Sequence, residues 1–109
     1  MTWPSELRLN AGRDCLTISF DDGKRFALSA EYLRVESPSA EVRRHGSPKQ
    51  IVRGKQAVKI TALEPVGNYA VRILFDDGHD SGLYSWDFLV KLGREQARIW
   101  AEYKRALSI

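Results

Sequence analysis

Cysteine is almost absent from this chain of 109 residues, because Cys15 is the only one. A single cysteine excludes an internal disulfide and any metal site built from several thiolates, and it suits a reducing compartment. No apolar run approaches the ~18 residues that a membrane-spanning helix needs, and the polar start at residues 1–6 lacks the apolar core of a signal peptide. We therefore expect a cytoplasmic protein that does not enter a membrane.

Motifs of the common catalytic classes are missing as well. The chain has no Gly-x-Ser-x-Gly, no Walker lysine loop and no Gly-x-Gly-x-x-Gly. Its two histidines are His45 and His79, and Asp80 directly follows His79, without the His-x-Asp/Glu spacing of a facial-triad iron site. Cys15 lies in an alternating apolar segment, which favours a buried, inert thiol over a nucleophile. The sequence therefore predicts a protein that is not an enzyme.

Acidic residues are absent from a 17-residue stretch, 43–59, that carries six of the 17 basic residues. The rest of the chain holds 17 − 6 = 11 basic and 14 acidic residues, so this stretch accounts for the net charge of +3. A solvated loop is one interpretation, and a patch for an acidic protein or a polyanion is the other. The stretch contains no aromatic ring on which a base could stack, which disfavours nucleic-acid binding.

An internal repeat is the most informative feature that is present. Residues 18–23 (ISFDDG) recur as residues 73–78 (ILFDDG), and residues 28–33 (LSAEYL) recur as residues 83–89 (LYSWDFL) with one insertion. Each copy predicts a strand, a tight Asp-Asp-Gly turn, a returning strand and a helical turn capped by Ser29 or Ser85. Two adjacent carboxylates could also serve as a paired acid site, but hairpin turns explain them more simply.

The remaining segments complete an α+β fold. Residues 6–9, 57–63 and 68–75 alternate like strands, and residues 64–67 (EPVG) predict a turn between the last two. Residues 94–107 have helical periodicity, with Gly93 as the cap that ends a short helix before them. We expect a small single domain, 1–109, of antiparallel β-hairpins packed with a C-terminal helix, its core within residues 6–103. Trp100 and Tyr103 are core residues or a docking surface.

The order LSAEYLR (28–34), then IxFDDGH (73–79), resembles the gamma-butyrobetaine hydroxylase-like N-terminal domain, a domain of unknown function (DUF971). The resemblance extends from about Glu6 to Tyr103. Members of this family occur as small bacterial proteins, precede the catalytic domain of carnitine-pathway oxygenases, and are fused to iron–sulfur-carrier ATPases. The resemblance therefore implies an accessory module rather than a hydroxylase.

The resemblance also implies a zinc site that this chain has lost. In the oxygenases three cysteines and one histidine look like a structural zinc site, and their positions fall here at Ser37, Ser39, Val42 and His79. Three of the four positions therefore hold residues that supply no thiolate, and one histidine binds zinc too weakly. We expect no metal and no cofactor, with His79 remaining as a turn residue.

The sequence leaves three functions open. The first is an accessory module that binds a protein, the second is a metal or iron–sulfur-related carrier, and the third is a polyanion binder that uses residues 43–59. The candidate partner-binding residues are Arg43, Arg44, Lys49, Arg53, Lys55, Arg98 and Arg105. The partner and the oligomeric state are not indicated by any motif.

Overall fold

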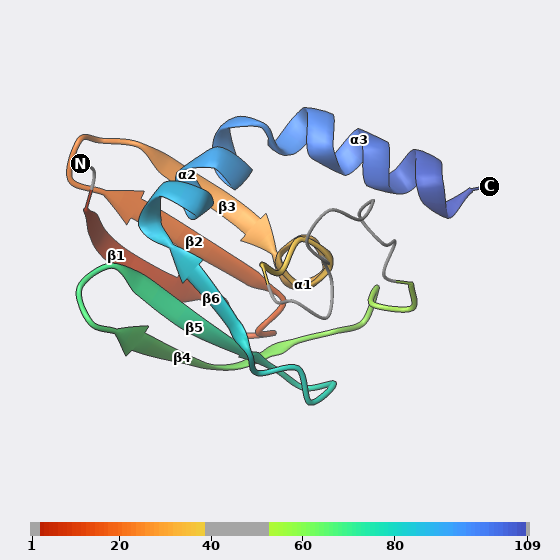
Figure 1. The fold of residues 1–109 in the computed structure, drawn as a ribbon, viewed down its shortest axis with the longest axis horizontal. Helices are drawn as coiled ribbons and strands as arrows, with labels where there is room; N and C mark the ends of the chain where they lie inside the picture. The colour runs from red at the N-terminus through yellow and green to blue at the C-terminus, as the bar shows by residue number, and fades with distance from the viewer. Residues whose placement is uncertain (1–2, 39–52, 109) are drawn as a thin grey trace.

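The computed structural model describes residues 3–38 and 53–108, which form two three-stranded antiparallel sheets and three helices (Figure 1). The first sheet has the order β1-β2-β3 and comprises β1 (Pro4–Leu9), β2 (Cys15–Phe20) and β3 (Arg25–Ser29). The second has the order β4-β5-β6 and comprises β4 (Ile60–Val66), β5 (Ala70–Phe75) and β6 (Gly82–Ser85). The helices are α1 (Ala30–Val35), α2 (Trp86–Arg94) and α3 (Gln96–Leu107). The predicted α+β class with hairpins and a C-terminal helix is confirmed.

The internal repeat is a structural repeat, β1-β2-β3-α1 followed by β4-β5-β6-α2. In the first turn, the Gly23 amide donates to Phe20 over 3.1 Å, and in the second the Gly78 amide donates to Phe75 over 3.2 Å. Both glycines have positive φ, 93° and 89°, a conformation that costs any residue with a Cβ. The Asp21 amide also donates to the carbonyl of Trp3, just before β1, and the Asp76 amide donates to that of Lys59, just before β4, each over 2.9 Å.

Both short helices begin as the sequence predicts. The Ser29 hydroxyl accepts a hydrogen bond from the Tyr32 amide at 3.0 Å, and the Ser85 hydroxyl accepts one from the Phe88 amide at 3.2 Å. An acidic residue lies in the first turn of each helix, Glu31 in α1 and Asp87 in α2. The serine caps satisfy otherwise orphaned amides, and the carboxylates favour the positive end of the helix dipole.

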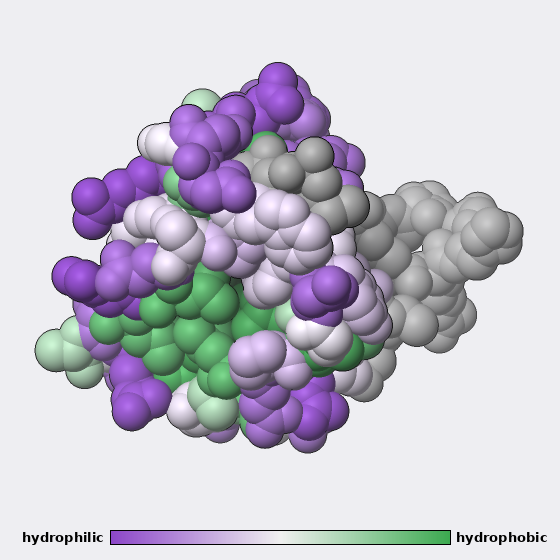
Figure 2. Space-filling view, turned by 90° about the vertical axis from the view of Figure 1, so that its left-hand side faces the viewer, coloured by the Kyte–Doolittle hydropathy of each residue, from purple (hydrophilic) through white to green (hydrophobic). Residues whose placement is uncertain are grey.

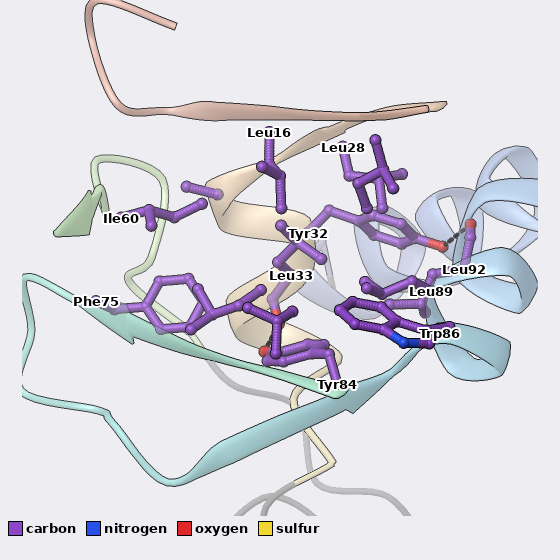
Figure 3. Close-up of a cluster of buried hydrophobic side chains, with 14 of the residues drawn as sticks. Leu16, Leu28, Tyr32, Leu33, Ile60, Phe75, Tyr84, Trp86, Leu89 and Leu92 are labelled. Atoms are coloured by element: carbon purple, nitrogen blue, oxygen red, sulfur yellow. Dashed lines mark hydrogen bonds between the residues drawn. The ribbon is translucent and has the colours of Figure 1, made fainter. Parts of the chain in front are cut away.

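The core lies between the sheets, and each half supports the other (Figure 3). The Tyr32 hydroxyl of α1 donates to the Leu92 carbonyl of α2 over 2.7 Å. The Tyr84 hydroxyl of β6 donates in turn to the Leu33 carbonyl of α1 over 2.5 Å. Both tyrosines are fully buried, so each hydroxyl needs such a partner.

The predicted turn at residues 64–67 is wrong, because β4 continues to Val66 and the turn occupies residues 67–69. Pro65 pairs with Val71 inside the ladder. The described ladders pair β4 with β5 alone, and an edge strand tolerates a residue without an amide proton. Gly67 has the positive φ, 53°, that the actual turn requires.

The predicted helix boundary at Gly93 is also wrong, because Gly93 lies inside α2 and the break falls at Glu95. A Cβ at position 93 would lie 2.3 Å from Cγ of Phe26, so glycine is required there by the close approach of α2 to β3. Of the two interpretations given for Trp100 and Tyr103, the core is confirmed for Tyr103, which is buried, whereas Trp100 is only partly buried against the central cluster.

Cys15 lies in β2 as expected but is half-buried rather than buried, because its side chain alternates away from the core face of Leu16 and Ile18. Figure 2 shows apolar side chains reaching one face of the molecule, framed by hydrophilic ones. Within the described residues, no helix is both long and apolar enough to cross a membrane.

Candidate functional site

The two Asp-Asp-Gly turns share a backbone but differ in their side chains. In the first turn the Lys24 amide donates to Asp22 over 3.0 Å, and in the second the His79 amide donates to Asp77 over 3.1 Å. Lys24 is exposed, whereas His79 is only 7% exposed. The second turn therefore carries a buried imidazole where the first carries a solvated amine, and this divergence marks it as the candidate site.

The imidazole of His79 contacts a side chain from the segment that follows α1. Nε2 of His79 lies 2.9 Å from Oγ of Ser37, which is fully buried. These two residues are 42 positions apart in the chain. The structure thus brings together two of the four positions at which the resemblance places zinc ligands, while Ser39 and Val42 lie outside the described residues.

An ion-pair cluster flanks the imidazole. Asp77 accepts from Nε of Arg34 at 2.8 Å and from Nζ of Lys55 at 2.7 Å. Partial burial alone would raise the pKa of Asp77, but hydrogen bonds from Lys55, the His79 amide and Arg34 lower it to about 2. The carboxylate therefore joins α1, the second turn and the segment before β4.

Close packing closes the site. A Cβ at Gly82 would lie 2.7 Å from Oγ of Ser37 and 2.9 Å from the Tyr84 ring, so only glycine leaves room for both side chains. Burial raises the pKa of the Tyr84 hydroxyl above its usual range. In the first copy Phe26 pairs with Ile18 as Gly82 pairs with Ile73, so Phe26 is the counterpart of Gly82. Beyond the single insertion the copies are 56 residues apart, so Gly93, on which the Phe26 ring packs, is the counterpart of Ser37.

The donor set limits the chemistry of this cluster. A hydroxyl 2.9 Å from an imidazole matches the geometry of a nucleophile and its base, but the fully buried hydroxyl of Ser37 is out of reach of a substrate. No group of three or more His, Cys, Asp or Glu side chains suited to a metal occurs among residues 3–38 and 53–108. One imidazole and one neutral hydroxyl do not fit a structural zinc ion, which takes four thiolate or imidazole ligands.

The predicted partner-binding residues are dispersed over the surface. Arg53 donates to the carbonyls of Ala106 and Leu107 at the end of α3, each at 3.3 Å, and Arg98 pairs with Glu95 and Glu102. Lys55 belongs to the cluster around Asp77, and Arg105 is exposed on α3. Arg43, Arg44, Lys49 and also His45 lie outside the described residues.

Sequence reasoning missed three members of the cluster, Arg34, Asp77 and Tyr84. The repeat contained a usable signal, because comparison of the two turns shows that Lys24 in one copy is replaced by His79 in the other. The contribution of Arg34 carried no such signal, because it depends on α1 packing against the turn of the other half.

Comparisons with known proteins agree with this fold. The family model described as gamma-butyrobetaine hydroxylase-like, N-terminal, matches residues 7–90. Two proteins with NMR solution structures are similar to this chain, at 48% and 42% identity with TM-scores of 0.85 and 0.84. Each comparison covers 99% of this chain, and they cover 81% and 86% of those chains respectively. A crystal structure of a DUF971-family protein of unknown function from Acidithiobacillus ferrooxidans is similar at 37% identity, covering 83% of this chain and 91% of that one, with a TM-score of 0.70. A search of the curated proteins found no significant match.

Proposed function

Because the chain belongs to the gamma-butyrobetaine hydroxylase-like N-terminal family, we propose that it is a non-catalytic accessory domain that acts by binding another protein. The observation that carries this proposal is the closed state of the candidate site. The Ser37 hydroxyl contacts the His79 imidazole, the Tyr84 hydroxyl donates to the Leu33 carbonyl, and these three residues with polar side chains are at most 7% exposed. Polar groups buried in this way stabilise the fold and are out of reach of a ligand. A function of this domain would therefore depend on its outer surface.

The surface of the two C-terminal helices supports the same proposal. Exposed cations on α2 and α3 include Lys91, Arg94, Lys104 and Arg105. Lys104 lies over the Trp100 ring, with Nζ 5.7 Å from its centroid. A rigid helical surface that combines charge with an aromatic ring suits recognition of an acidic protein surface.

The test is recovery of a partner from native cells, with the tagged protein as bait at endogenous expression. We expect one protein in a near-stoichiometric amount, and we expect its recovery to fall when exposed cations of α2 and α3 are neutralised. Repeated recovery of none, together with saturation by a small metabolite, would overturn the proposal.

A metal carrier is the second candidate, and the contact between Ser37 and His79 is the observation that favours it. Two positions at which relatives place zinc ligands are adjacent here, so a metal with further ligands from elsewhere would use this corner. Elemental analysis of the purified protein separates the two candidates. Near-stoichiometric zinc or iron, lost in His79→Ala, supports a carrier, and folded metal-free protein opposes it.

A polyanion binder is the third candidate and depends on residues 43–59. Affinity for a polyanion would then fall steeply with salt, and neutralising Arg43 and Arg44 would flatten that dependence. An interaction that does not respond to salt would exclude this candidate.

A further inference from the structure

The second copy contains the buried cluster of Arg34, Ser37, Asp77 and His79. The repeat predicts a counterpart to this cluster in the first copy, at the place where turn 21–24 faces α2. In the second copy, turn 76–79 meets Arg34 of α1 and Ser37, which follows that helix. In the first copy, the corresponding turn 21–24 faces α2 across a pocket of about 550 Å³. Val90 occupies the position that matches Arg34, so no guanidinium reaches across to the carboxylate of this turn. The space that is closed in one half is open in the other.

Charged side chains surround this pocket, which we call the α2 pocket. Its lining is Lys24, Asp87, Val90, Lys91, Arg94 and Glu95. The helical spacing of positions 87, 90, 91 and 94 places their side chains on one face of α2, opposite the turn that carries Lys24. The volume is within the range of pockets that hold ligands or side chains of a partner.

Some charged groups of the pocket are paired, whereas two of its cations have no ion pair within the described part of the chain. Arg98 pairs with Glu95, and this hydrogen bond, with the nearby charges of Lys91 and Arg94, lowers the pKa of Glu95. Lys24 pairs with Asp22 at 2.6 Å. Within residues 3–38 and 53–108, Lys91 and Arg94 form no ion pair, although Asp87 and Glu95 lie in the same lining. The lining carries three cations and two carboxylates, so the pocket has a net charge of 3 − 2 = +1.

We propose that the α2 pocket binds an acidic segment of a protein partner, with Lys91 and Arg94 receiving its carboxylates. Residues three apart on a helix have neighbouring side chains, so these two cations can contact one or two adjacent carboxylates. The apolar side chain of Val90 provides a surface for the methylene groups of a bound glutamate. This inference rests on the proposed function and names the surface and the chemistry of the partner.

An alternative role for the same cations is purely structural. Lys91 and Arg94 lie in the last turn of α2, where positive charge stabilises the negative end of the helix dipole. The last turn of α3 also carries two cations, Lys104 and Arg105, which are adjacent in sequence rather than three residues apart. The double variant K104Q/R105Q is therefore a comparison variant, because it removes two cations of the same outer surface that do not line the pocket.

The experiment titrates the full-length protein with a capped hexaglutamate peptide and follows amide chemical shifts. We expect shifts centred on Lys24, Lys91 and Arg94, at least tenfold weaker binding in K91Q/R94Q, and at most twofold weaker binding in K104Q/R105Q. Capped hexaglutamine should not bind. Equal weakening in both double variants would show diffuse charge attraction and overturn the proposal.

Three other outcomes would also overturn it. These are no binding at millimolar peptide, binding of inorganic phosphate at the same residues with equal affinity, and loss of stability in K91Q/R94Q without any loss of binding. The partner recovery experiment separates this inference from the broader proposal. If wild type and K91Q/R94Q recover the same protein equally well, the accessory role stands and the α2 pocket is not its contact.

Discussion

Asp77→Asn should destabilise the protein far more than Asp22→Asn, although the two residues occupy the same position in the repeated turn. The side chain of Asp77 is 18% exposed, and Arg34 and Lys55 both pair with it. Its pKa of about 2 lies 3.8 − 2 = about 1.8 pH units below the ordinary 3.8. At 1.36 kcal/mol per unit this gap corresponds to about 2 kcal/mol, and solvent screening reduces the expected effect to about 1–2 kcal/mol.

The sign of the pH dependence follows from the lowered pKa of Asp77. The stabilisation is fully present above the unfolded pKa near 4 and is lost as the pH falls through the folded pKa of about 2. The difference in unfolding free energy between wild type and Asp77→Asn should therefore be constant near pH 7, shrink below pH ~5 and vanish by pH ~1. Urea unfolding at a series of pH values measures this difference.

The Asp22→Asn variant is the control, because Asp22 is exposed and pairs with the neighbouring Lys24. It should show a smaller loss than Asp77→Asn at pH 7. Equal losses in the two variants, or a difference for Asp77→Asn that does not change between pH 7 and pH 2, would refute the assignment of Asp77 as the centre of the ion-pair cluster.

Three further changes test the packing of the two halves, each measured by urea unfolding. Gly93→Ala should lower the free energy of unfolding by about 1–3 kcal/mol because the new methyl group meets the Phe26 ring. Phe26→Leu should restore part of this loss, and a Gly93→Ala variant of unchanged stability would contradict the contact. Tyr84→Phe should cost about 1–3 kcal/mol because the buried Leu33 carbonyl loses its donor, and an unchanged midpoint would argue against that bond. Ser85→Ala should cost about 1 kcal/mol through loss of the helix cap, whereas Ser85→Asp should retain most of the stability.

The parts of the fold that the sequence predicted correctly depend on interactions between residues that are close in the chain. Positive φ at Gly23 and Gly78 follows from an Asp-Gly turn between alternating strands, and the caps at Ser29 and Ser85 follow from their place before short helices. The Asp-Gly turn and the capping serine each occur in both copies of the repeat, so each prediction rested on two occurrences. Local rules were sufficient at these positions because the partner groups lie within a few residues.

The predictions that failed depended on contacts between distant segments. Gly93 is a common residue at a helix end, but here it is required by the Phe26 ring, 67 residues earlier in the chain. Pro65 is a common turn residue, but β4 accepts it within a strand. In the candidate site, the contact of Ser37 with His79 was suggested only by the family resemblance, and the pairing of Arg34 with Asp77 was not predicted at all.

The reciprocal bonds from Tyr32 to Leu92 and from Tyr84 to Leu33 have a consequence for the two units of the repeat. Each hairpin-plus-helix unit is held to the other by one of these bonds, so one unit alone would leave a buried tyrosine hydroxyl without its partner and would expose part of the shared core. Because the two copies carry different side chains at matching positions, the corner at Ser37 and His79 is sealed while the corresponding corner at Lys24 and Arg94 is accessible.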